Sequence, residues 1–329
     1  RSEARTAPME DAVSDPRREK LVGAWLTLPT FNDDNYDLLL DRHRVHLRWL
    51  IDQGFKEGNA VLMLARGNGE GTFLEESEWR ALADVLAEEA VGKVPTALGV
   101  YEFSARAAAR KAKYAADLGI DFIQLAPPHY MSPTDDDVFG YYDYVNTASD
   151  VGIVAYNLPW CIPGSYEFTQ PLFERFATLE NIVGIKWGCI SIQHWAKMIR
   201  LFKHRFNFIE QGGILSVGYR LGMVGFTDAL GAVAPRLSLK KWELISEKRF
   251  EELDEMEIAK LDAIVSDTRL DLAVYGGMGE GPTSREPLRA LGMDTGPVFP
   301  YQQPLSDYWI QNNRRVADVL KLDAWVDWD

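Results

Sequence analysis

The sequence predicts an α/β protein: a (β/α)8 (TIM) barrel followed by a C-terminal helical domain. Short apolar runs recur along the chain, and amphipathic segments with helical spacing separate them. Strands that alternate with helices imply a parallel sheet, and eight such units imply a closed barrel. The length of 329 residues suits a barrel that forms one unit. An open doubly wound sheet is the alternative, but no G-x-G-x-x-G motif follows a first strand.

The strand-like runs are bounded by polar, Gly or Pro residues. They are Leu21–Leu28, Ala60–Ala65, Val94–Val100, Asp121–Ala126, Gly152–Tyr156, Ile182–Lys186, Phe206–Gln211 and Val224–Ala229. Residues 37–54, 76–90 and 105–119 are typical of the helices between them, and the first and third of these segments end in glycine.

The rest of the chain is too long to be only an eighth helix. Residues 241–265 and 306–325 have helical patterns, and residues 275–287 have the composition of a loop. We therefore expect a flexible polar leader over residues 1–20, the barrel over residues 21–248 and a C-terminal helical domain over residues 249–329.

Composition narrows the class of partner and compartment. The net charge of −14 disfavours nucleic acid, whose phosphates require a basic surface. No apolar run approaches the roughly 18 residues of a membrane-spanning helix, so we expect no membrane partner. The only cysteines are Cys161 and Cys189, which makes a disulfide framework improbable and favours a reducing, cytoplasmic location.

Lys186 ends the sixth apolar run, in "NIVGIKWGC". Barrel enzymes place their chemistry at the C-terminal ends of the strands. A lysine there is either a strand-end residue paired with a carboxylate or a nucleophile whose pKa is lowered by burial. In the second case the neutral amine attacks a ketone carbonyl to form a Schiff base. The position of Lys186 in the barrel alone supports the ion-pair and the Schiff-base interpretations equally.

Two tyrosines and a turn follow other predicted strands. Tyr156 ends the strand before that of Lys186, so its phenol is either a core hydroxyl or a proton shuttle. Tyr130 in "PPHY" has the same alternatives. Gly67 and Asn68 lie in the turn "RGNGE", whose backbone N–H groups are suited to a carboxylate, although a plain βα turn is the simpler interpretation.

The eighth strand adds Thr227 and Asp228 as candidate substrate-binding residues. Trp187, Trp25 and Trp160 also fall near strand ends, where they indicate either an aromatic substrate or ordinary barrel packing. The histidines form no H-E-x-x-H motif, so we expect no metal site.

Together these segments resemble the dihydrodipicolinate synthase / N-acetylneuraminate lyase family, over Leu21 to Trp325. "AYNLPW" and "NIVGIKWG" are similar to the Y-N-x-P and G-x-K signatures, "NGEGTFLEESEW" to the G-E-x-x-x-L-x-x-x-E segment, and "LAPPHY" to P-P-x-Y. The resemblance implies a Schiff-base lyase that acts on pyruvate or another 2-oxo acid without a cofactor. It assigns Lys186 as nucleophile and Tyr156 as proton shuttle. Tyr130 matches an aromatic that completes a proton relay from a neighbouring subunit, and a homotetramer or homodimer is expected.

The departures from the family pattern indicate an atypical member. The usual turn is G-T-T-G-E, so Gly67 and Asn68 replace its two threonines. The synthases carry an arginine after Y-N-x-P that holds the second substrate's carboxylate, whereas "WCIPG" has none. The resemblance therefore argues against an authentic dihydrodipicolinate synthase.

Two subgroups of the family are closer. The 5-dehydro-4-deoxyglucarate dehydratases have a G-T-G-E turn and an x-Gly after the lysine, and the aromatic hydratase-aldolases place an aromatic directly after it, like Trp187. A 2-oxo-acid-binding barrel without catalysis and a structural subunit of a hetero-oligomer are the alternatives of another class.

Overall fold

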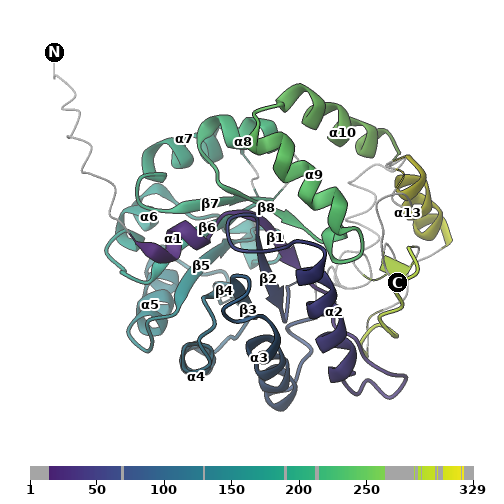
Figure 1. Ribbon diagram of the computed structural model, residues 1–329. Helices are drawn as coiled ribbons and strands as arrows, with labels where there is room; N and C mark the ends of the chain where they lie inside the picture. Colours follow the sequence, from purple (N-terminus) through teal and green to yellow (C-terminus); the bar gives the residue numbers. More distant parts are fainter. Residues whose placement is uncertain are drawn as a thin grey trace.

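A computed structural model describes residues 15–67, 70–128, 130–188, 191–211, 215–263, 285, 288–289, 291–300, 302, 307–319 and 321. Eight parallel strands close into a barrel in the order of the sequence, β1 to β8 (Figure 1). The strands are β1 Gly23–Thr27, β2 Ala60–Leu64, β3 Thr96–Val100, β4 Phe122–Leu125, β5 Gly152–Asn157, β6 Ile182–Trp187, β7 Asn207–Glu210 and β8 Gly225–Asp228. The predicted fold class is confirmed, and each predicted strand matches an observed one to within two residues at either end.

Helices surround the strands (Figure 1). They are α1 Pro16–Lys20, α2 Leu40–Asp52, α3 Glu76–Ala90, α4 Ala105–Asp117, α5 Asp135–Asn146, α6 Gln170–Phe176, α7 Ile192–Phe202, α8 Leu215–Leu221, α9 Pro235–Ser246, α10 Phe250–Ala263 and α13 Asp307–Val319, with short 3-10 turns η1 Pro163–Ser165 and η2 Leu230–Ala232.

The core has two layers because successive strand residues point to opposite faces. The outer layer packs between strands and helices and includes Leu26, Ile185 and Phe226. The inner layer fills the barrel and includes Trp25 and Tyr156. Only every second residue of a strand therefore points into the barrel interior, and we call this set of positions the inward phase of the strand.

A β-bulge sets this phase in β6. Ile153 of β5 pairs with Ile182, but the next residue of β5, Val154, pairs with Gly184, so Val183 is an extra residue without a partner. A bulge of this kind reverses the alternation of the residues that follow it. Lys186 consequently points into the barrel, whereas Trp187 points toward the helices.

The segment expected to be a flexible leader is ordered at its C-terminal end. Residues 16–20 form α1, whose N-cap Asp15 accepts a hydrogen bond from the backbone N–H of Arg17. Arg17 donates to the carbonyl of Asp150 at 2.8 Å. Arg18 donates to the side chain of Asn207 at 3.0 Å. Helix α1 is therefore attached to the end of the barrel at which the strands begin.

Where it is described, the C-terminal part contains the helices α10 and α13, whereas residues 293–299 form neither helix nor strand. Within the segment with a helical pattern, residues 241–263 are divided between α9 and α10, and Lys248 between them has a positive φ of 58°. Helix α10 packs against α9 and α13. The boundary at residue 249 and a separate C-terminal domain stay predictions.

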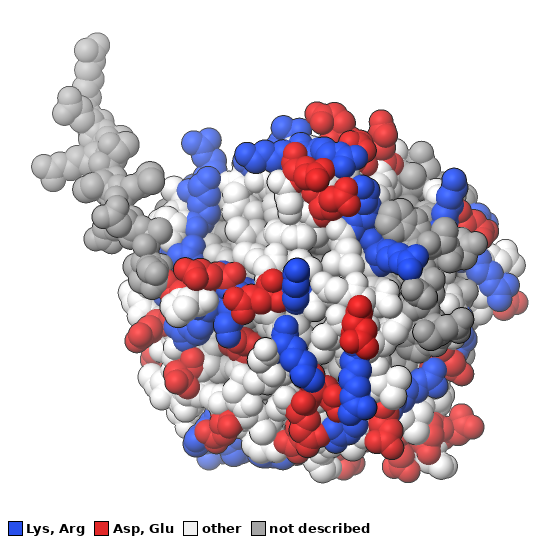
Figure 2. All heavy atoms as spheres, in the orientation of Figure 1, with Lys and Arg blue, Asp and Glu red and all other residues white. Residues whose placement is uncertain are grey.

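Charges of both signs are interspersed on the face shown in Figure 2. Over the described residues, no helix is both long and apolar enough to cross a membrane.

Candidate active site

Lys186 lies at the C-terminal end of β6 with only 2% of its surface exposed. Its Nζ is 4.1 Å from the centroid of the Tyr156 ring, which belongs to the neighbouring strand β5. In the β5–β6 register the two residues are direct partners. The strand ends thus hold an amine and a phenol side by side in a space largely closed to water.

A hydrogen-bonded chain of three side chains crosses the interior beside them. The indole Nε1 of Trp25 on β1 donates to Oε1 of Gln124 on β4 at 3.0 Å. The Nε2 of Gln124 donates to the phenol oxygen of Tyr101, which directly follows β3. Neither Gln124 nor Tyr101 was predicted as a site residue from the sequence. Both follow only when the inward-facing residues Ala97 and Phe122 are known, because steps of two residues from these lead to Tyr101 and Gln124.

The turn after β2 packs against β3. Ala65 has a positive φ of 49°, a conformation that strains a residue with a side chain and is common near functional sites. The carbonyl of Ala65 lies so close to Gly99 that a Cβ there would be 1.9 Å away. The Gly67 carbonyl accepts the Glu70 N–H at 2.8 Å. Asn68, the other predicted carboxylate ligand, lies outside the described residues.

Two guanidinium groups converge on the Glu70 carboxylate behind this turn. Arg66 Nε donates to it at 3.1 Å and Arg285 Nε at 2.7 Å, and all three side chains are almost fully buried. Burial alone would raise the pKa of Glu70, but the two arginines outweigh it and hold this pKa below its ordinary value. With two cations and one anion, the cluster carries surplus positive charge.

Several buried polar atoms near the strand ends have no hydrogen-bond partner in the described part of the chain, and three of them belong to residues in the inward phase. They are Oγ1 of Thr27, Oγ1 of Thr227 and Oε1 of Gln211. Thr227 pairs in register with inward-facing Trp25, so it also faces the interior. These atoms are available to the polar groups of a ligand.

Two predicted substrate-binding residues point away from the barrel, and these predictions are corrected. Trp187 is fully buried in the outer layer, where it stacks on Phe173 at 5.2 Å and donates to Glu167 at 3.0 Å. Asp228 accepts hydrogen bonds from the N–H of Leu230 and the hydroxyl of Ser238. Neighbouring residues on a strand face opposite sides, so Trp187 cannot accompany Lys186, nor Asp228 accompany Thr227, into the interior.

Asp228 instead belongs to a buried ion-pair cluster. Its carboxylate lies 3.6 Å from Lys241 Nζ, which is 3.1 Å from Glu257. Burial would lower the pKa of Lys241, but these two carboxylates overcome it and raise the pKa above its ordinary value. The cluster joins β8 to α9 and α10.

Aromatic side chains form the rim above the site. Tyr130 is 79% exposed and contacts Phe103 edge-on at 5.7 Å. Trp160 packs edge-on against Tyr156 at 6.2 Å and covers Gly188, where a Cβ would lie 2.4 Å from the indole. Tyr130 therefore lies at the surface, whereas Trp160 lies next to the Tyr156 and Lys186 pair.

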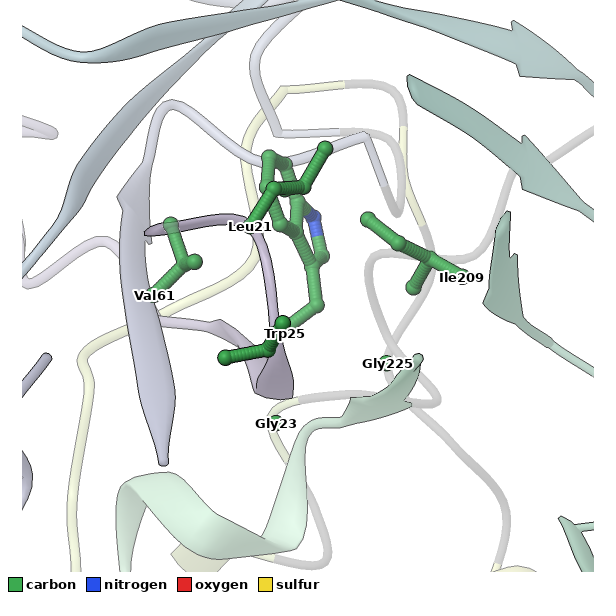
Figure 3. Close-up of a pocket in the computed structure, with 7 residues that line it drawn as sticks. Leu21, Gly23, Trp25, Val61, Ile209 and Gly225 are labelled. Carbon is green, nitrogen blue, oxygen red and sulfur yellow. The ribbon is translucent and has the colours of Figure 1, made fainter. Parts of the chain in front are cut away.

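A small apolar pocket lies at the opposite end of the barrel (Figure 3). Its lining includes Leu21, Val61 and Gly225 at or near the starts of strands, and Trp25 and Ile209 farther along β1 and β7. Its lining residues include no ionisable side chain, so we do not assign the pocket to the site, although Ile209 is the β7 partner of Lys186. Within the described ranges, no three His, Cys, Asp or Glu side chains are grouped to hold a metal ion.

A closed parallel barrel with an amine and a phenol at its strand ends defines the class of barrel enzymes with catalysis at the C-terminal face. A sequence model of the "Dihydrodipicolinate synthetase family" matches residues 35–266, more than half of the chain. The protein belongs to this family and is a lyase of the class I aldolase-lyase superfamily.

Relatives support the same assignment. A 4-hydroxy-tetrahydrodipicolinate synthase from Methylobacterium radiotolerans is 29% identical over 66% of this chain and 71% of its own length. The enzyme of that name from Bradyrhizobium diazoefficiens is 27% identical over 58% of this chain and 64% of its own length. A DapA-like lyase from Thermococcus kodakarensis is 28% identical over 70% of this chain and 79% of its own length.

Solved structures share the fold. The sialic acid aldolase of Ruminococcus gnavus matches with a TM-score of 0.77 at 17% identity, over 93% of this chain and 99% of the aldolase. The dihydrodipicolinate synthase DapA-2 of Bacillus anthracis matches with a TM-score of 0.76 at 17% identity, over 91% of this chain and 97% of the synthase. At this identity the likeness concerns the fold alone.

Proposed function

We propose that the protein is a Schiff-base lyase that acts on pyruvate or a related 2-oxo acid. The observation that carries the proposal is Lys186, 2% exposed at the end of β6, with Nζ 4.1 Å from the Tyr156 ring centroid. An amine in such surroundings is suited to nucleophilic attack on a carbonyl carbon, and a phenol beside it to proton transfer.

In the proposed reaction, the Lys186 amine attacks the keto carbon to give a carbinolamine. Tyr156 transfers a proton to the carbinolamine oxygen, which leaves as water and produces the iminium. The iminium then accepts the electron pair of the bond that breaks: a C–C bond in aldol cleavage, or a C–H bond followed by C–O loss in dehydration. Because the lysine itself is the electron sink, the reaction requires no cofactor.

The substrate carboxylate would lie against the turn that contains Gly67 and Asn68. Behind this turn, the Arg66, Glu70 and Arg285 cluster supplies positive charge in a buried setting. Charges interact more strongly in such a setting than in water, which favours an anion at the turn.

A hydroxylated substrate is favoured over a purely aromatic one. Thr27, Thr227 and Gln211 present polar atoms without hydrogen-bond partners among the described residues. Trp187, the residue that indicated aromatic hydratase-aldolase chemistry, lies outside the barrel interior. The 5-dehydro-4-deoxyglucarate dehydratase-like alternative is therefore the better supported of the two. We do not propose authentic dihydrodipicolinate synthase activity, because "WCIPG" contains no arginine.

Borohydride trapping tests the proposal. We expect incubation with pyruvate or a longer 2-oxo acid, followed by reduction and peptide mass spectrometry, to give an adduct on Lys186. The Lys186→Arg variant, which keeps the charge, should give none. An unmodified Lys186 across a panel of 2-oxo acids would refute the proposal. Trapping without turnover of any hydroxylated 2-oxo acid would favour the binding-protein alternative.

We also propose that a second copy of the chain covers the aromatic rim, in a homodimer or homotetramer. Tyr130, Met131, Phe103 and Trp160 are 79%, 63%, 50% and 42% exposed on the loops that follow β3, β4 and β5. Exposed apolar groups gathered in this way are typical of protein interfaces. Sedimentation velocity should show a lower mass for Tyr130→Ser with Met131→Ser than for Val45→Ser, an exposed residue on α2. A monomeric wild type would contradict this proposal.

A further inference from the structure

The ring of Tyr101 occupies a slot whose walls are backbone. A Cβ at Gly99 would lie 2.5 Å from the ring, one at Gly71 3.0 Å, and one at Gly67 3.1 Å from the hydroxyl oxygen. We call these three residues the glycine slot. The slot holds the ring against the turn after β2 and places the hydroxyl beside Gly67. Tyr101 is only 9% exposed, so this polar group lies in the interior.

The chain of hydrogen bonds behind Tyr101 fixes which way its hydroxyl points. An indole N–H can only donate, so the Trp25 bond identifies the amide atom facing it as the oxygen of Gln124. The amide nitrogen of Gln124 must then be the atom that faces Tyr101, and it donates to the phenol oxygen. The phenol proton is consequently directed toward an acceptor other than Gln124.

We propose that Tyr101 is a substrate-binding residue whose hydroxyl donates a hydrogen bond to the carboxylate of the 2-oxo acid held at Gly67. This proposal rests on the proposed function. It explains why position 67 is glycine, since a side chain there would occupy the space beside the hydroxyl. The ligand class follows from charge: Arg66 and Arg285 outnumber Glu70 behind the same turn, which favours an anionic acceptor.

The test compares wild type with Tyr101→Phe, which keeps the ring and removes the hydroxyl. The readout is the pyruvate concentration that gives half-maximal borohydride trapping on Lys186. A hydrogen bond to a charged group is worth enough that its loss should raise this concentration about 10-fold or more, with trapping at saturation unchanged. Acetone, a ketone without a carboxylate, should be trapped equally by both proteins.

Tyr142→Phe is the matched control. It removes another buried phenol hydroxyl, which donates to the carbonyl of Leu125, but Tyr142 lies in the outer layer. Its half-saturating pyruvate concentration should equal that of wild type. Trapping of wild type together with an unchanged half-saturating concentration in Tyr101→Phe would overturn the Tyr101 proposal alone. Absence of any wild-type adduct would overturn the proposed function and this proposal with it.

A double-mutant comparison tests the geometry. Gly67→Ala should raise the half-saturating pyruvate concentration several-fold, because its methyl group would lie 3.1 Å from the Tyr101 oxygen. In the Tyr101→Phe background the same substitution should have a smaller effect. Independent, multiplicative effects of the two substitutions would contradict contact between the hydroxyl and position 67.

Discussion

At the scale of single residues, Asp228 shows how one polar side chain serves packing although its neighbour faces the site. Its carboxylate accepts the N–H groups of Leu230 and Gly231 and the hydroxyl of Ser238, and it faces buried Lys241. Every one of these partners belongs to η2 or α9. Asp228 therefore links the end of β8 to η2 and α9. Thr227, its neighbour on the strand, faces the barrel interior.

We predict that Asp228→Asn lowers the free energy of unfolding by about 3 kcal/mol, because Lys241 would keep a buried charge with one of its two carboxylates removed. Urea denaturation measures this. The half-saturating pyruvate concentration for trapping should not change.

The control for this prediction is Asp254→Asn, an exposed carboxylate on α10 that should alter the unfolding free energy by less than about 0.5 kcal/mol. If Asp228→Asn changed the half-saturating pyruvate concentration several-fold without changing stability, Asp228 would be a substrate-binding residue and this interpretation would be wrong.

At the scale of elements, hydrogen bonds attach α1 to the first residue of β7 and to the loop before it, and α1 also contacts β6. Arg18 donates to the side chain of Asn207 and to the carbonyls of His204 and Lys203. Asn207 in turn donates to the carbonyls of Arg18 and Leu21. A five-residue helix has little stability alone, so these contacts stabilise α1.

We predict that Arg18→Ala lowers the free energy of unfolding by about 1–3 kcal/mol, the cost of losing hydrogen bonds from a charged donor. Glu19→Ala, on the exposed side of the same helix, should change it by less than about 0.5 kcal/mol. Chemical denaturation of the two variants distinguishes an attached helix from a flexible leader, for which both substitutions would be equally neutral.

The β6 bulge is the other element that matters for function. Without the extra residue at Val183, Trp187 would take the inward phase and Lys186 would face the helices. The candidate nucleophile thus depends on one irregularity in an otherwise regular strand.

At the scale of the whole molecule, buried neutral histidines make stability depend on pH. Burial, together with the neighbouring His46, lowers the pKa of His43 to about 3. Burial lowers the pKa of His46 to about 4. Both lie on α2, beneath Phe31 and near the Glu70 cluster. In the unfolded chain these groups bind a proton near pH 6.5.

Below pH 6.5 the unfolded chain binds a proton at each histidine, but the folded chain does not because its histidine pKa values are lower. The contribution of each neutral histidine to stability is therefore fully present above pH 6.5 and is lost as the pH falls toward the folded-state pKa. We predict that each histidine lowers the free energy of unfolding by up to about 1.4 kcal/mol for each pH unit below 6.5. Urea midpoints between pH 7 and 5 measure this slope. The range excludes the carboxylates, which titrate at lower pH.

His43→Gln keeps an acceptor for the Phe31 N–H and does not titrate, so its stability should fall less steeply on acidification than that of wild type. The exposed His204→Gln should parallel wild type. Parallel profiles for all three proteins would contradict the prediction.

The sequence by itself determined the alternation of strands and helices, and hence the barrel, because period-2 and period-3.6 patterns are local properties. It also placed Lys186 and Tyr156 at neighbouring strand ends, since consecutive strands of a barrel pair in order. The motifs that resemble the family likewise placed the turn at Gly67 at the end of the second strand.

Only the tertiary structure decided which side chains face one another. Alternation along a strand gives relative phase but not absolute phase, and an unpaired residue such as Val183 shifts it without a local signal. For that reason Trp187 and Asp228 were placed on the wrong face, and Tyr101 and Gln124 were missed. The contact of Arg285 with Glu70 joins residues 215 positions apart, which no local pattern encodes. Facing side chains depend on closure of the barrel, and closure is a property of the whole chain.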